Sequence, residues 1–137
     1  MPVVLDANVA VEWFLPSAND VASRALDLVV ADGAMVPALW RWEVQDVLHR
    51  LHLAGKLTAP VESIRAELRE LPIAVDHELT GLFGNEAAVA ARFSLSVYDA
   101  AYLELAIRLH VPLATNDRGL AAAAKAAKLP AVTRGNK

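Results

Sequence analysis

The chain has 137 residues, enough for one domain with a sizeable core, and 55% of them are hydrophobic. It has no cysteine, which excludes a disulfide scaffold, a thiol nucleophile and any cysteine-based metal site. With 13 basic and 16 acidic residues, the formal net charge of −3 excludes a broad basic surface for non-specific binding to nucleic acid. No apolar run is long enough for a membrane-spanning helix, and the N-terminal segment lacks the basic region of a secretory signal. We therefore expect a cytoplasmic protein that does not enter a membrane.

Short apolar runs alternate with helical patterns along the chain. The runs predict strands at 3–5, 34–36, 73–75, 111–115 and 131–133. The helical patterns predict helices at 18–31, 38–54, 79–93, 97–110 and 119–128, a helix from a Thr58 cap to about residue 71, and a short helical turn at 7–14. Ser17 and Ser96 are further candidate N-caps. This alternation predicts a parallel sheet with helices on both faces, whose ligands bind beyond the carboxyl ends of the strands.

Four acidic residues lie at or near those predicted strand ends. Asp6 follows the first strand directly, and Asp117 comes just after the fourth. Glu43 lies in the first two turns of the helix after the second strand, and Asp99 lies in the first turn of the helix capped at Ser96. Three of them also fit a purely structural interpretation, since an aspartate is favoured as an N-cap or in a first helical turn. Glu43 fits it least well, because its neighbours on the helix are expected in the core.

Taken together, the four carboxylates indicate a metal site. Carboxylates that converge repel one another, so a fold does not keep such a group for stability. Hard oxygen ligands suit Mg²⁺ or Mn²⁺, and such an ion supports phosphodiester hydrolysis by activating water and neutralising developing negative charge. A bound cation would also reconcile an acidic chain with a polyanionic substrate.

Four segments resemble the successive motifs of a known family. They read VVLDANVAVEWFLP, VPALWRWEVQDVLHR, SLSVYDAAYLELAIRL and VPLATNDRGL. In this order they resemble PIN-domain proteins, in particular the VapC-type toxin ribonucleases of prokaryotic toxin–antitoxin pairs, from about residue 3 to 120. The resemblance implies an α/β fold, a three-layer α/β/α sandwich with a five-stranded parallel sheet, as a single PIN-like domain over 1–137. It also implies an endoribonuclease that depends on Mg²⁺ or Mn²⁺ as its cofactor.

The same resemblance assigns roles to individual residues. The four acids become the catalytic and metal-binding residues: Asp6, Glu43, Asp99 and Asp117. Asn8 and Thr115 match polar residues that support the metal ligands or contact the substrate phosphate. One departure is Asp46, where family members often have asparagine, so its participation is left open.

The resemblance also implies partners. These are an RNA substrate, a cognate antitoxin protein whose C-terminal segment lies in a groove near the site, and a second copy of the chain in a homodimer. Trp13, Phe14 and Leu15 are candidate contacts for the antitoxin, although a place in the core explains them equally well. Arg41 and Arg118 flank two of the acids and are candidate contacts for RNA phosphates, with surface ion pairs as the alternative.

Other interpretations use the same residues less well. A phosphatase of the haloacid-dehalogenase type needs a second aspartate two residues after the first, where this chain has Asn8. A non-catalytic receiver-like module would need paired acids near the first strand. A PIN fold without activity is a third alternative, against which the presence of all four acids argues. Among the remaining residues, Tyr98 and Tyr102 are expected to pack within the protein, and the spacing of His49 and His52 does not favour a zinc site.

Overall fold

The centre of the molecule is a parallel β-sheet. The computed structural model describes residues 1–16, 19–77 and 84–132. Within these residues the sheet has four strands in the order β3-β2-β1-β4. They are β1 (Val3–Leu5), β2 (Ala34–Val36), β3 (Ile73–Val75) and β4 (Leu113–Ala114). All three side chains of β1 are fully buried, as expected for a central strand covered on both faces.

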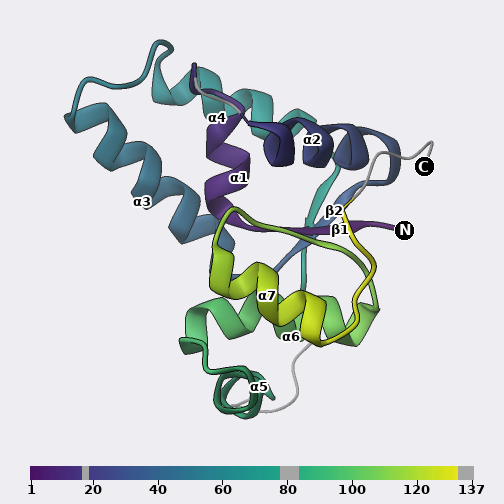
Figure 1. Cartoon of the computed structure of the whole chain (residues 1–137). Helices are drawn as coiled ribbons and strands as arrows, with labels where there is room; N and C mark the ends of the chain where they lie inside the picture. Colours follow the sequence, from purple (N-terminus) through teal and green to yellow (C-terminus); the bar gives the residue numbers. More distant parts are fainter. Residues whose placement is uncertain (17–18, 78–83, 133–137) are drawn as a thin grey trace.

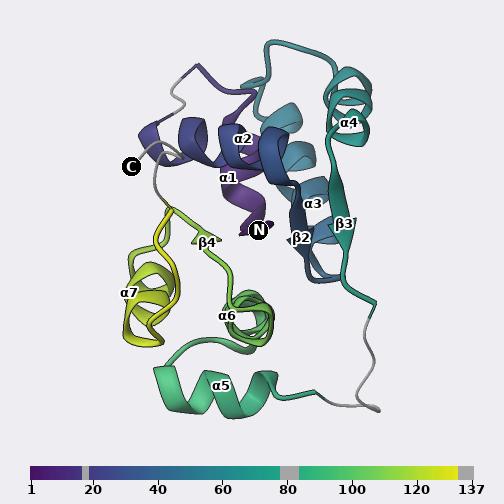
Figure 2. The ribbon, with the colours of Figure 1, turned by 90° about the vertical axis from the view of Figure 1, so that its right-hand side faces the viewer.

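Helices cover both faces of the sheet. They are α1 (Ala7–Glu12), α2 (Asp20–Asp32), α3 (Trp40–Leu53), α4 (Val61–Glu70), α5 (Glu86–Phe93), α6 (Val97–Leu109) and α7 (Arg118–Ala126). Figures 1 and 2 show α1 to α4 on one side of the strands and α5 to α7 on the other. The predicted three-layer α/β/α sandwich is therefore confirmed.

The strand order explains this division of the helices. The chain moves outward from β1 to β2 and β3, and then returns past β1 to place β4 at the opposite edge. Because crossovers between parallel strands are right-handed, reversing the direction of travel places the later helices on the other face. The reversal occurs between β1 and β4, which is where a crevice opens in sheets of this kind.

The predicted fifth strand is wrong within the described residues. Residues 131 and 132 are not in a strand, and residue 133 lies outside the described residues. Pro130 precedes them and has no backbone N–H to donate to a neighbouring strand. Instead, Ala131 and Val132 line a hollow beside Leu113 and Thr115. The fourth strand is also shorter than predicted, since only Leu113 and Ala114 are paired.

Several helix boundaries differ from the prediction for local reasons. The N-cap of α2 is Asn19, whose side chain accepts a 2.9 Å hydrogen bond from the Ala22 N–H, and the predicted cap Ser17 lies outside the described residues. Thr58 is not a cap, because α4 begins only after Pro60, whose fixed φ suits a helix start. The predicted helix at 79–93 is described only from residue 84, and α5 occupies its second half.

None of the helices among the described residues combines the length and the apolar character needed to cross a lipid bilayer.

Candidate active site

Asp6 and Thr115 meet at the carboxyl ends of the two strands that flank the reversal. The register pairs Leu5 with Ala114, so the next residues of both strands emerge side by side. The Asp6 N–H donates to the Ala114 carbonyl at 3.0 Å, and the Thr115 hydroxyl donates to Asp6 Oδ2 at 2.7 Å. Both side chains are buried. The two side chains therefore lie together at the carboxyl ends of β1 and β4.

Burial governs the ionisation of Asp6. Loss of solvent raises the pKa of the Asp6 carboxyl above its ordinary value, because the charged form is poorly solvated there. The Thr115 hydroxyl and the backbone N–H of Asn8 oppose this rise by donating to the carboxylate, whereas the nearby charge of Asp99 adds to it. The Asn8 side chain itself is exposed, so its observed contribution comes from the backbone.

Glu43 reaches the same region from α3. It is half-buried, and its Oε1 accepts a hydrogen bond from the hydroxyl of Tyr102 on α6. Burial raises the pKa of Glu43, the Tyr102 hydrogen bond lowers it, and the charges of Asp6 and Asp99 raise it further. Burial and the adjacent glutamate also raise the pKa of Tyr102, which keeps its proton and acts as the donor.

Asp99 combines a structural role with an electrostatic one. Its backbone N–H donates to the Ser96 hydroxyl at 3.1 Å, which confirms Ser96 as the N-cap of α6. Its half-buried carboxylate lies close enough to repel both Asp6 and Glu43. Three acids from three elements that are distant in sequence thus form one electrostatic group, which we call the acid group: Asp6, Glu43 and Asp99.

Asp117 lies at the margin of the acid group. Its side chain is engaged as the N-cap of α7, where Oδ2 accepts a 2.7 Å hydrogen bond from the Leu120 N–H. Its own N–H donates to Thr115 Oγ1 at 3.0 Å, so the Thr115 hydroxyl connects it to Asp6. Within the described residues, no three acidic or histidine side chains are arranged to hold a metal ion as they stand. The four-acid metal centre stays a prediction.

A second polar network near the site was not predicted. Asn116, between Thr115 and Asp117 in sequence, donates to Glu12 Oε2 at 2.7 Å and accepts from Asn19 at 3.0 Å. These contacts tie the end of α1 and the start of α2 to the loop after β4. Nothing in the spacing of the three residues indicates this, because Asn116 is 104 residues from Glu12 and 97 from Asn19.

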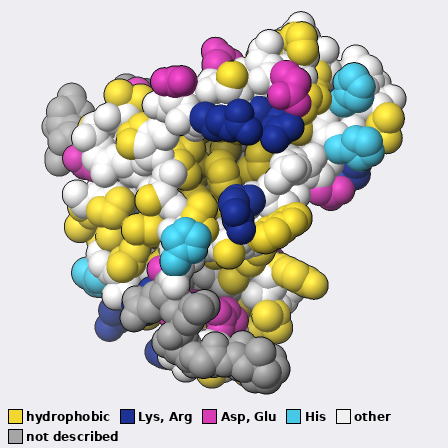
Figure 3. Space-filling model, turned by 180° about the vertical axis from the view of Figure 1, so that it is seen from behind, with side chains coloured by type: hydrophobic (Ala, Val, Ile, Leu, Met, Phe, Trp, Pro, Cys, Tyr) yellow, Lys and Arg dark blue, Asp and Glu magenta, His cyan; other side chains and the backbone are white. Residues whose placement is uncertain are grey.

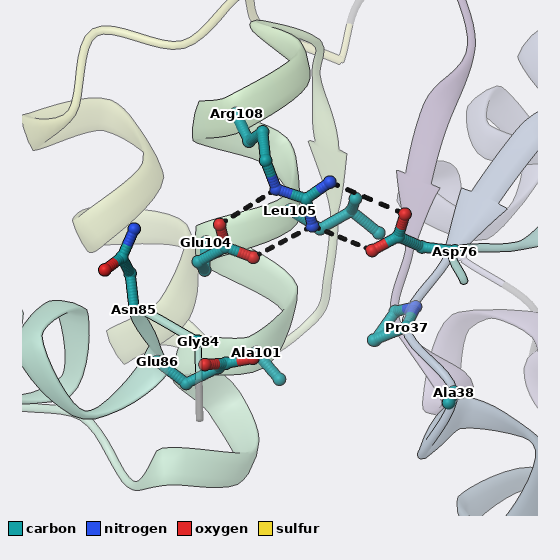
Figure 4. Close-up of a pocket in the computed structure, with 10 residues that line it drawn as sticks. All are labelled: Pro37, Ala38, Asp76, Gly84, Asn85, Glu86, Ala101, Glu104, Leu105 and Arg108. Atoms are coloured by element: carbon teal, nitrogen blue, oxygen red, sulfur yellow. Dashed lines mark hydrogen bonds and ion pairs between the residues drawn. The ribbon is translucent and has the colours of Figure 1, made fainter. Parts of the chain in front are cut away.

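An ion-pair cluster lies beyond the ends of β2 and β3. Arg108 of α6 pairs with Asp76 at 2.7 Å and with Glu104 at 3.0 Å, beside a hollow of about 220 Å³ (Figure 4). The two carboxylates raise the pKa of the Arg108 guanidinium. Because Asp76 follows β3 and Arg108 belongs to α6, the cluster joins the edge of the sheet to the opposite helical layer. We interpret it as a structural connection.

The remaining predicted residues have varied positions. Trp13, Phe14 and Leu15 are partly buried against the core, and the Trp13 indole donates to the Ala22 carbonyl at 2.7 Å. Asp46 is exposed and pairs with Arg50 at 3.2 Å, so it takes no part in the acid group.

The packing role predicted for the tyrosines is right for Tyr102 and wrong for Tyr98. Tyr102 is buried against the core, whereas 69% of the Tyr98 surface is exposed. Arg41 and Arg118 are also exposed, and no ion pair is found for either within the described part of the chain. The surface ion pairs that were the alternative interpretation of these two arginines are therefore absent there, and their contact with RNA stays a prediction.

Comparisons with known proteins agree with this architecture. The chain is 34% identical over 122 residues to ribonuclease VapC3 from two strains of Mycobacterium tuberculosis, CDC 1551 / Oshkosh and ATCC 25618 / H37Rv, an alignment that covers 88% of this chain and 86% of the relative. A crystal structure of PAE2754 from Pyrobaculum aerophilum has a similar fold, with a TM-score of 0.67 and 20% identity over 96% of this chain and 90% of that one. The family model of the PIN domain matches residues 3–136. The chain therefore belongs to the PIN domain family.

Proposed function

We propose that the chain is a metal-dependent endoribonuclease, the toxin of a type II toxin–antitoxin module, which hydrolyses phosphodiester bonds in RNA. Membership of the PIN domain family and the similarity to ribonuclease VapC3 support this activity. The observation that carries the proposal is the acid group itself. The charge of Asp99 raises the pKa of both Asp6 and Glu43 at the point where the sheet reverses its strand order.

The donor chemistry of the acid group fits a hard divalent cation. Its side chains offer only carboxylate oxygens, which suit Mg²⁺ or Mn²⁺ rather than a softer metal. Two of the three carboxyls have raised pKa values, so a cation would offset a real electrostatic cost. Asp6, Glu43 and Asp99 would hold the ion, with Asp117 as the fourth predicted ligand. When bound, the ion would supply Lewis-acid activation of water and charge neutralisation at the phosphate.

The residues around the acids orient them. Thr115 fixes the Asp6 carboxylate by donating to Oδ2, and Tyr102 fixes Glu43 by donating to Oε1. Each donor stabilises the charged form of its partner and so opposes the rise in pKa that burial causes. Such preorganisation matters because the groups that act on the phosphate need not reorganise during the reaction.

The proposal also includes partners that follow from the family. These are an antitoxin that covers the acid group and a second copy of the chain in a homodimer. Neither involves a membrane. Of the candidate antitoxin contacts, Trp13, Phe14 and Leu15 keep part of their surface accessible.

Cleavage of single-stranded RNA by the purified chain tests the activity. We expect cleavage with Mg²⁺ or Mn²⁺, none in excess chelator, and a loss of about a hundredfold or more in Asp99→Asn. Asp46→Asn is the matched control, because Asp46 is an exposed acid on α3 outside the acid group. Cleavage that persists in chelator, or that is equal in Asp99→Asn and the parent, would refute the proposal.

A further inference from the structure

A basic groove lies between α3 and α4, and α3 also carries Glu43 of the acid group. Arg41 of α3 and Arg65 and Arg69 of α4 border a hollow of about 260 Å³. Its apolar lining is contributed by Trp40, Val44 and Leu68. Figure 3 shows this face, with Lys and Arg side chains on two sides of a hollowed apolar floor. The concentration of cations is notable because the chain as a whole is acidic, with a net charge of −3.

The cations of the groove are available to a ligand. Within the described residues, neither Arg41 nor Arg69 has a carboxylate at ion-pair distance. Arg65 pairs with Glu62 at 2.9 Å, but the Glu62 side chain is 80% exposed, and such surface pairs contribute little and exchange readily. Arg65 and Arg69 are four residues apart and therefore lie on the same face of α4, about one helical turn from each other.

An unpartnered donor lies in the lining of the same groove. Trp40 is 8% exposed, and its indole Nε1 is buried without a hydrogen-bond acceptor among the described residues. A buried N–H without a partner carries a cost of about 1–3 kcal/mol. Because this N–H is itself buried, the donors that the groove offers to an oxygen-rich anion are the guanidinium groups at its border.

Arg41 of the groove and Glu43 of the acid group lie on different sides of α3, about 200° apart around the helix, with Trp42 between them. Arg41, Trp42 and Glu43 are consecutive, so their side chains point in successive directions around the helix, about 100° apart. Trp42 is 62% exposed, and the Arg41 guanidinium lies over its ring at 4.7 Å. An exposed aromatic ring stacked with arginine is a surface on which a nucleobase stacks.

We propose that this groove binds single-stranded RNA through its phosphates, and that Trp42 guides the strand from the groove to the acid group. Arg41, Arg65 and Arg69 contact successive phosphates, and a base stacks on Trp42. The exposed ring between the cations and the acids favours RNA over an acidic protein segment, which has no base to stack there. This inference rests on the proposed function, because it supplies the path of that enzyme's substrate.

Binding of a fluorescent single-stranded RNA hexadecamer, measured by anisotropy in excess chelator, tests the groove without cleavage. We expect Arg41→Ala/Arg69→Ala to bind about tenfold more weakly than the parent. Because two phosphate contacts are lost, the slope of log affinity against log salt should become shallower by about 1.4. Arg41→Lys/Arg69→Lys keeps both charges and should retain the parental slope. This variant also tests the proposal if the alanine variant does not fold.

The matched control is Arg92→Ala/Lys125→Ala, which removes the same charge from α5 and α7 on the opposite side of the sheet. It should bind RNA like the parent. Equal RNA affinity of the groove variant and this control would overturn the proposal. So would a groove variant that keeps its RNA affinity but loses binding of a glutamate-rich dodecapeptide, because the occupant would then be an acidic protein segment. Metal-dependent cleavage by the parent is measured separately, so a failed proposed function is distinguishable from a failed groove.

Discussion

The Thr115 hydroxyl donates a 2.7 Å hydrogen bond to Asp6 Oδ2 across the carboxyl ends of β4 and β1. The same hydroxyl oxygen accepts from the Asp117 N–H at 3.0 Å. One small side chain thus connects the first strand, the last described strand and the start of α7. It also lowers the pKa of a carboxyl that burial raises. Thr115 is therefore a positioning residue for Asp6.

Thr115→Val removes this hydroxyl at nearly constant shape. The buried Asp6 carboxylate loses a donor, so we expect the free energy of unfolding at neutral pH to fall by about 2 kcal/mol. The measurement is chemical denaturation, with the exposed Thr58→Val as control. RNA cleavage should also fall, and its acid limb should move to higher pH because the pKa of Asp6 rises. Equal stability of the two valine variants would contradict this role of Thr115.

The pH dependence of stability should carry the signature of Asp6. Burial raises the pKa of Asp6 in the folded protein above the ordinary 3.8, so between these two values the native state binds more protons than the unfolded state. The contribution of Asp6 to stability is therefore fully present below the ordinary value and is lost as pH rises through the folded pKa. Asp6→Asn removes this contribution, so its stability relative to the parent should increase with pH across that window. Denaturation of both proteins at several pH values measures the difference, and a difference that does not change with pH would contradict the assignment.

Tyr102 should tune Glu43 through its hydroxyl. Tyr102→Phe removes the hydrogen bond that lowers the pKa of Glu43, so this pKa should rise further. If cleavage needs ionised Glu43, the acid limb of kcat/KM against pH should shift to higher pH. Tyr98→Phe is the control, because Tyr98 is exposed and makes no such contact with Glu43. The same shift in both variants would show that the Tyr102 hydroxyl is not responsible.

Asp117 offers a way to separate capping from catalysis. Asp117→Asn retains an oxygen that accepts from the Leu120 N–H, and asparagine is as good an N-cap as aspartate. We expect the melting temperature to change little and metal-dependent cleavage to fall, since only the negative charge is lost. Asp117→Ala should lower stability by about 1 kcal/mol as well. Full activity in Asp117→Asn would restrict Asp117 to the cap of α7.

The sequence predicts those parts of the site that depend on local order. Asp6 and Asp117 are predicted at the same edge of the sheet, because each follows a short apolar run and parallel strands end at one edge. The Ser96 cap of α6 follows from its spacing to Asp99. These features depend on residues that are near one another in the chain or on the alternation of strands and helices.

Contacts that depend on how the helices pack against one another could not be predicted from the sequence. Tyr102 and Glu43 are 59 residues apart, and their hydrogen bond exists only because α6 and α3 reach the same strand ends from opposite layers of the sandwich. The apolar pattern predicts that Tyr102 is buried, but it does not predict that Glu43 is its hydrogen-bond partner. The predicted fifth strand is not formed by the described residues for a related reason. An apolar run after Pro130 has strand character, but it becomes a strand only if it pairs with the edge of the sheet.

We propose that Asp6, Glu43 and Asp99 gather around one divalent ion. Titration of the purified chain with Mn²⁺ in a calorimeter tests it most directly. We expect saturable binding to the parent and to Asp46→Asn, with affinity at least about tenfold weaker in Asp99→Asn because a ligand and its charge are lost. Equal Mn²⁺ affinity in the parent and Asp99→Asn, or no binding to the parent, would contradict it.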